Sequence, residues 1–193
     1  MTSRPKLILA STSPYRKKLL ERLQVPFEAM APHVDESLFK NLGADPVSLA
    51  LCLAQKKAQA IATKFPEAIV IGSDQVATVG EEILDKPGNK EQAIIQLTKL
   101  SGRMHRLITA VSVSHRGASR DWTEVTEITL RQLSSSEIED YVTAENAWDC
   151  VGSYKIEGLG ISLFTGVKGN DPTGIEGLPL ISLSAVLREL GVR

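Results

Sequence analysis

The stretch LILASTSPYRKKLL, residues 7–20, is the part of the sequence that best defines the fold. Four apolar or small residues lead into a run of hydroxyl residues, and a proline and a basic segment follow. This order predicts a short buried strand that enters a helix, with Ser13 as the N-cap and Pro14 as the first helical residue. Leu19, Leu20 and Leu23 are then expected on the buried side of that helix.

A strand that ends at the start of a helix is also a favourable place for an anion. The backbone N–H groups of the first helical turn lack intrahelical partners, and the helix dipole is positive at this end. Ser11 and Ser13 add hydroxyl groups, and Arg16 adds a cation that can form charge-assisted hydrogen bonds. We therefore expect these three residues to bind phosphate.

The composition is that of an ordinary globular protein. The chain has 193 residues, with 42% hydrophobic and 23% charged residues and a formal net charge of −1. This length suits one domain spanning residues 1–193, and the charge gives no reason to expect a nucleic-acid partner. The apolar runs are too short for a signal peptide or a membrane span, so we expect a cytoplasmic protein. Two cysteines, Cys52 and Cys150, do not make a disulfide framework.

A second helix is predicted from Asp45-Pro46, a cap and first-turn proline, to about Lys64. Lys57 falls at the edge of its apolar face. Two interpretations of Lys57 are about equally supported: a side chain that snorkels at the rim of the core, or a cation directed along the core edge toward a cleft. The apolar face is expected to comprise Val47, Ala50, Leu51, Ala54, Ala58 and Ile61.

Residues 69–71, Ile-Val-Ile, predict a short central strand that is followed directly by Gly72-Ser73-Asp74-Gln75. Open α/β sheets place their chemistry at the carboxyl ends of such strands, so Asp74 is a candidate functional acid. The alternative is that Asp74 only caps a turn.

The remaining pattern alternates strands and helices. A hairpin around Gly80, a helix from residue 89 or 90 to 101, strands at 107–114 and 122–130, and a final helix after Gly177-Leu178-Pro179 are expected. The fold class is therefore α/β, with a mixed central sheet flanked by helices.

The candidate residues point to phosphate chemistry. Carboxylates together with phosphate oxygens are the usual ligands of Mg²⁺ or Mn²⁺, and cations neutralise the remaining phosphate charge. The set fits metal-assisted attack of water on a phosphoanhydride. Histidines with metal-ligand spacing, a Walker-type loop and a Gly-x-Ser-x-Gly elbow do not occur, and Gly158-Leu159-Gly160 is only a fragment of a dinucleotide fingerprint. The candidates are Asp35, Glu36 and Asp74 among the acids and Arg16, Lys57, Lys86 and Lys155 among the cations.

An ordered series of short motifs along nearly the whole chain resembles the Maf family of nucleotide pyrophosphatases. No single motif is decisive, but their order is specific. The series comprises residues 10–16 (ASTSPYR), 34–36 (VDE), 54–58 (AQKKA), 72–76 (GSDQV), 86–87 (KP), 100–102 (LSG), 152–158 (GSYKIEG) and 177–180 (GLPL).

The resemblance implies a Maf/ITPase-like fold with a cleft between two lobes, and an enzyme that hydrolyses a nucleoside triphosphate to its monophosphate and diphosphate with a divalent cation, Mg²⁺ or Mn²⁺. It implies Asp74 as the general base. It also places active-site positions at Ser11, Ser13, Arg16, Glu36, Lys57 and Lys86, with Glu36 and Asp74 as the metal-holding acids, and it suggests a homodimer.

Three positions make the chain similar to the family branch that acts on 7-methyl-GTP. They are Tyr15, Gln75 and Glu157, although that branch usually carries Trp where this chain has Tyr15. A methylated guanine is cationic, so an aromatic face and a carboxylate suit it. The competing interpretation of Tyr15 and Glu157 is a surface aromatic and a solvated turn residue. Two other functions stay open: a dTTP/UTP pyrophosphatase of the same family, and a nucleotide-binding regulator of cell division and septum formation.

Overall fold

The computed structural model describes residues 5–40 and 45–192, without the side chain of Lys40. Its contacts divide the chain into two compact units. The first comprises the described parts of Met1–Asp74, Thr109–Glu124 and Asp171–Arg193, and the second comprises Gln75–Ile108 and Val125–Asn170.

The strands form one mixed sheet, in agreement with the expected fold class. The order is β2-β1-β3-β5-β6-β7, and β4 pairs with β3. Strand β1 is parallel to both β2 and β3, whereas β4 and β7 are antiparallel to their neighbours. The strands are β1 (Leu7–Leu9), β2 (Glu28–Ala29), β3 (Ile69–Val79), β4 (Glu82–Leu84), β5 (Met104–His115), β6 (Ala118–Leu130) and β7 (Phe164–Lys168).

Six α-helices and two 3₁₀ turns are found in the described residues. They are α1 (Pro14–Glu21), α2 (Ser37–Lys40), α3 (Pro46–Ala62), α4 (Lys90–Leu100), α5 (Ser135–Glu145), α6 (Leu180–Glu189), η1 (Leu159–Leu163) and η2 (Gly174–Glu176). None of these helices is long and apolar enough to cross a membrane.

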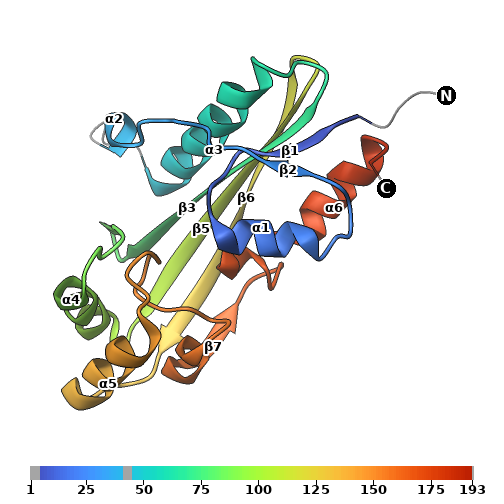
Figure 1. The fold of residues 1–193 in the computed structure, drawn as a ribbon. Helices are drawn as coiled ribbons and strands as arrows, with labels where there is room; N and C mark the ends of the chain where they lie inside the picture. The colour runs from blue at the N-terminus through green and yellow to red at the C-terminus, as the bar shows by residue number, and fades with distance from the viewer. Residues whose placement is uncertain (1–4, 41–44, 193) are drawn as a thin grey trace. The chain divides into compact units, whose positions relative to one another are not determined.

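In the first unit, helices cover both faces of the sheet (Figure 1). A hydrophobic core lies on each face of the sheet, and alternate residues of β1 belong to different cores because successive side chains of a strand point to opposite faces. Leu7 and Leu9 pack with leucines of α1 and α6, while Ile8 packs with Ala58 and Ile61 of α3. The result is a helix–sheet–helix arrangement in which α1 and α3 lie on opposite faces of the same strands.

The predicted helix caps are confirmed. The Ser13 hydroxyl accepts a hydrogen bond from the backbone N–H of Arg16, and the Asp45 carboxylate accepts from Val47 and Ser48. These bonds satisfy N–H groups that have no intrahelical partner. The hairpin around Gly80 is also confirmed, and Cys52 and Cys150 are not joined by a disulfide.

Two details of the sequence prediction are wrong. Strand β3 does not end at Ile71 but continues through Asp74 to Val79, since Val76, Ala77 and Val79 are buried and extend the pairing. The buried face of α3 contains Leu49 and Leu53, whereas Val47 is exposed and Leu51 only half-buried. The apolar stripe of this helix is wide, and the edge that packs against the sheet carries Leu49 and Leu53, not Val47 and Leu51.

Candidate active site

Three charged side chains meet in the first unit. The ammonium nitrogen Nζ of Lys57 lies 2.6 Å from Oδ1 of Asp74 and 2.7 Å from Oε1 of Glu36. Lys57 and Asp74 are buried, with 7% and 6% of their surface exposed, whereas the Glu36 side chain is 45% exposed. One cation thus holds two carboxylates from segments far apart in the sequence.

Close packing of α3 on β3 brings Lys57 to Asp74. A Cβ atom on Gly72 would lie 2.2 Å from the backbone oxygen of Ala54 and 2.6 Å from the backbone nitrogen of Ala58. Only a glycine at this point lets the helix backbone approach the strand so closely. Lys57, one residue before Ala58, is therefore buried on the sheet side, and the snorkelling interpretation does not hold.

A second set of contacts joins α1, β3 and the turn before α6. The carbonyl oxygen of Gly177 accepts hydrogen bonds from Nε of Arg16 and from the Ser73 hydroxyl, both at 2.9 Å. Gly177 has a φ of 99°, in the left-handed region that favours glycine. This bond uses Nε, and no hydrogen bond from the two terminal nitrogens of the guanidinium is found within the described part of the chain; these nitrogens could therefore donate to a ligand.

The hydroxyl groups of Ser11 and Ser13 bind backbone N–H groups at the start of α1. The sequence predicts instead that N–H groups at this helix start are free to bind an anion. The Ser11 hydroxyl oxygen accepts from the backbone N–H of Ser13, and that of Ser13 accepts from Arg16. A phosphate here would therefore meet hydroxyl groups in the role of donors, since each serine keeps its O–H proton while its oxygen accepts.

Burial and charge act in opposite directions on the ionisable groups. Removal from water raises the pKa of Asp74 above its ordinary value, although the positive charges of Lys57 and Arg16 work against this shift. For Arg16, burial disfavours the charged form and so lowers the pKa, whereas the negative charges of Asp74 and Glu36 act to raise it. An arginine remains protonated at neutral pH, so the group keeps its charge.

Glu36 and Asp74 are the residues of this cluster that could hold a divalent cation. Both carboxylates lie on the ammonium of Lys57, so the two groups are close enough together to hold one ion. Within the described ranges no group of three or more His, Cys, Asp or Glu residues could hold a metal ion. Mg²⁺ is often held by one or two carboxylates plus substrate phosphates, so this pair fits such a site.

Other candidate residues have different surroundings. The Asp35 carboxylate accepts from the backbone N–H and the hydroxyl of Ser37, the first residue of α2. Lys155 donates from Nζ to the backbone oxygens of Glu145 and Asn146 at the end of α5. Asp35, a candidate metal ligand, and Lys155, a candidate phosphate cation, therefore both make local structural contacts in this fold.

The predicted specificity residues are divided between the units. Tyr15, on α1, is half-buried and belongs to the first unit. Gln75 follows Asp74 within β3 and is counted with the second unit, as are Lys86 and Glu157, which are exposed. The residues that sequence reasoning missed are Ser73 and Gly177; both lie in motifs of the Maf-like series, but nothing in the sequence indicated that they contact Arg16 or each other.

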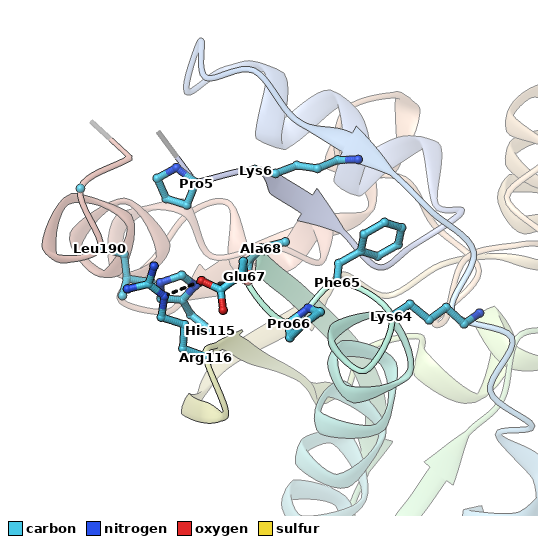
Figure 2. Close-up of a pocket in the computed structure, with 11 residues that line it drawn as sticks. Pro5, Lys6, Lys64, Phe65, Pro66, Glu67, Ala68, His115, Arg116 and Leu190 are labelled. Carbon is cyan, nitrogen blue, oxygen red and sulfur yellow. Dashed lines mark hydrogen bonds and ion pairs between the residues drawn. The ribbon is translucent and has the colours of Figure 1, made fainter. Parts of the chain in front are cut away.

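A hollow of about 940 Å³ elsewhere in the first unit is not this site. Lys6 and Ala68, which precede β1 and β3, line it, so it lies at the end of these parallel strands opposite to Ser11 and Asp74 (Figure 2). Two of its cations have acidic partners: Arg116 binds Glu67 at 3.0 Å, and Lys6 binds Glu28 at 2.9 Å. The residues that line this hollow do not include Glu36, Lys57 or Asp74.

Comparison with known proteins assigns a family to this sequence. The family described as Maf-like protein matches residues 6–190. A protein named 7-methyl-GTP pyrophosphatase from Xanthomonas campestris pv. campestris (strain 8004) is 50% identical over 188 residues, 97% of each chain. Proteins of the same name from Xanthomonas oryzae pv. oryzae (strain MAFF 311018) and Albidiferax ferrireducens are 51% and 46% identical, covering 97% of this chain and 97% and 94% of their own.

A solved structure supports the fold class. A HAM1 protein from Coxiella burnetii matches with a TM-score of 0.51 and 16% sequence identity, over 96% of this chain and 99% of that chain. At this identity the likeness shows the fold alone, and it confirms the expected Maf/ITPase-like α/β class.

Proposed function

This chain belongs to the Maf family, and on that premise we propose that it hydrolyses 7-methyl-GTP to 7-methyl-GMP and diphosphate. The relatives that match nearly its full length carry the name of that activity. The structural observation that supports it best is the pair of carboxylates, Asp74 and Glu36, on the single ammonium of Lys57. Acids and cations at the end of a strand-to-helix turn suit a triphosphate and a divalent cation.

Phosphate recognition is assigned to the start of α1. Arg16 is held by Gly177 through Nε, so its terminal nitrogens form a fixed fork that matches phosphate oxygens. The hydroxyl groups of Ser11 and Ser13 donate beside it. Lys86 is proposed as a further phosphate cation on the resemblance alone.

Asp74 is proposed as the general base. Its burial favours the protonated form, and a carboxylate with a raised pKa accepts a proton more readily than an exposed one. The attacking water gives its proton to Asp74 as its oxygen adds to the α-phosphorus. The bond from that phosphorus to the oxygen bridging the α- and β-phosphates breaks, and diphosphate leaves with the bridging oxygen. Lys57 keeps the carboxylate in place and balances its charge before the proton arrives.

A divalent cation, Mg²⁺ or Mn²⁺, is proposed at Glu36 and Asp74. When bound it would offset the charge of the triphosphate and polarise the phosphoryl oxygens. Glu36 is suited to this role because its side chain is exposed and its carboxylate lies on the same ammonium as that of Asp74.

Base selection is assigned to Tyr15, Gln75 and Glu157. The ring of 7-methylguanine is cationic, so an aromatic face attracts it by about 0.5–2 kcal/mol. A carboxylate can accept from the ring N–H and the exocyclic amine together, and a pyrimidine lacks this paired donor edge.

The test is a panel of 7-methyl-GTP, GTP, dTTP and UTP, with diphosphate release measured with Mg²⁺ or Mn²⁺ and with chelator. GTP differs from the first substrate by one methyl group and the ring charge, so the preference for 7-methyl-GTP should be roughly 2- to 30-fold. Equal or better kcat/KM on dTTP or UTP would favour the pyrimidine alternative. Nucleotide that is bound but left intact would favour a regulator of cell division.

The setting proposed for this activity is the cytoplasm, where free nucleotides are the substrates and neither nucleic acid nor membrane takes part. A homodimer remains a prediction from the family resemblance. Sedimentation of the purified protein tests it, and a single species with the mass of one chain would contradict it.

A further inference from the structure

We propose that Tyr141 and Glu145 of α5 are positioning residues for Glu157, and that they set the preference for the cationic purine through it. The inference rests on the proposed function, in which Glu157 selects the base. All the residues that carry it belong to the second unit and lie in α5 or in the segment formed by residues 155–160.

The segment is fixed before Glu157 by two contacts of Lys155. Its backbone N–H donates to the Tyr141 hydroxyl at 3.2 Å, and its ammonium donates to the backbone oxygens of Glu145 and Asn146, each at 3.3 Å. A cation at the C-terminus of a helix is stabilised by the helix dipole. Both ends of Lys155 are thus bound to α5.

The segment is fixed after Glu157 by the carboxylate of Glu145, whose Oε2 accepts from the backbone N–H of Leu159 at 2.6 Å. This carboxylate also lies against Gly158, where an added Cβ would come within 2.5 Å of Oε2. The backbone N–H groups of Gly158 and Gly160 both donate to the carbonyl of Lys155. The Gly-Leu-Gly run is explained by this closed loop.

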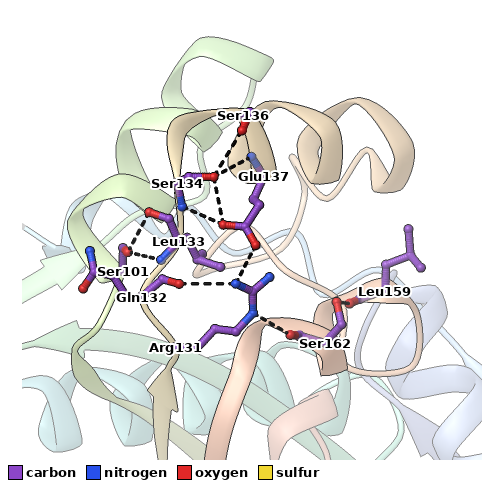
Figure 3. Close-up of polar contacts among 9 residues, drawn as sticks. All are labelled: Ser101, Arg131, Gln132, Leu133, Ser134, Ser136, Glu137, Leu159 and Ser162. Atoms are coloured by element: carbon purple, nitrogen blue, oxygen red, sulfur yellow. Dashed lines mark hydrogen bonds and ion pairs between the residues drawn. The ribbon is translucent and has the colours of Figure 1, made fainter.

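The helix that makes these contacts is itself held at its other end (Figure 3). Ser134 and Glu137 form a capping box at the start of α5. Arg131 donates to the Glu137 carboxylate at 2.7 Å and to the backbone oxygen of Ser162, in η1, at 3.2 Å. Because η1 follows directly after Gly158, the same network holds both the helix and the far end of the segment.

The two supporting residues are less exposed than Glu157. Tyr141 is 6% exposed and Glu145 is half-buried, whereas Glu157 is exposed between two fixed points. A carboxylate that recognises a flat base edge through two hydrogen bonds must be held to within about 0.5 Å. Two anchors on one helix supply that rigidity, so their loss should weaken base recognition and leave the phosphate chemistry intact.

The experiment compares Glu145→Ala, Glu145→Gln and Tyr141→Phe with the wild type, using the full chain. Glu139→Ala is the matched control, because Glu139 is an exposed acid of the same helix. We expect the ratio of kcat/KM for 7-methyl-GTP to that for UTP to fall roughly tenfold in Glu145→Ala, through KM. Glu145→Gln keeps an acceptor oxygen and should recover most of the ratio, and Tyr141→Phe tests the other anchor in a variant with an intact ring.

A double variant with Glu157→Ala separates positioning from general damage. If Glu145 acts through Glu157, Glu145→Ala should change the ratio no further in that background. An unchanged ratio in both Glu145→Ala and Tyr141→Phe, or full additivity with Glu157→Ala, would overturn the inference and leave the proposed function standing. A wild type that hydrolyses 7-methyl-GTP no better than UTP would instead remove the proposed function, and this inference with it.

Discussion

The ammonium of Lys57 lies 2.6 Å from the carboxylate of Asp74, and both side chains are buried. A buried charge without its partner is costly, so Lys57→Met should lower the free energy of unfolding by about 3 kcal/mol and reduce turnover sharply. Urea unfolding measures the first effect. In the double variant Lys57→Met/Asp74→Asn the uncompensated charge is gone, and stability should recover in part; a double variant as unstable as the sum of both single variants would contradict the pairing.

The approach of α3 to β3 predicts a strong effect of a single methyl group. Gly72→Ala should destabilise the protein by about 2 kcal/mol or more and lower activity, because the added Cβ meets the backbone of Ala54 and Ala58. Gly166→Ala is the control, since a Cβ there would meet nothing within 4 Å. Thermal unfolding checks both variants, and equal melting temperatures would show that the helix is not held by this glycine.

Arg16 is expected to act on the phosphates and not on the base. Arg16→Lys removes both the Nε bond to Gly177 and the guanidinium fork, so kcat/KM should fall roughly 10- to 100-fold. The loss should be the same for 7-methyl-GTP and UTP. Lys17→Met, at an exposed position of the same helix, serves as the control. A loss confined to 7-methyl-GTP would move Arg16 from phosphate binding to base recognition.

His105 predicts how stability depends on pH. It is buried against the Tyr154 hydroxyl, and burial lowers its pKa from 6.5 to about 4. The unfolded chain takes up this proton below about pH 6.5, whereas the folded protein does so only near pH 4, so stability is lost as the pH falls between these values. The loss amounts to up to about 3 kcal/mol. His105→Gln should show a flatter decline of melting temperature from pH 7 to pH 4, and an unchanged decline would contradict the assignment.

The first strand, its helix and the cap at Ser13 could be predicted from sequence because they depend on local signals: an apolar run, a hydroxyl and a proline. Asp74 could be identified as a candidate, but not placed correctly, since the length of β3 depends on pairing with β4. The burial of Lys57 depends on Gly72, which is 15 residues away in the sequence and has no periodic signal. The contacts of Gly177 with Arg16 and Ser73 span 161 and 104 residues, beyond any local pattern.

The most direct test of the central claim is diphosphate release by Asp74→Asn, with Asp35→Asn as the control acid. Aspartate and asparagine have nearly the same shape, so nucleotide binding should persist in Asp74→Asn. The amide cannot act as a base, so kcat should fall by a factor of about 10²–10⁴. Asp35→Asn should keep most of the turnover, because the Asp35 carboxylate binds the neighbouring Ser37 and an asparagine oxygen can accept the same bonds. Turnover by Asp74→Asn close to that of the wild type would show that the proton goes elsewhere, and the account of this site would fail.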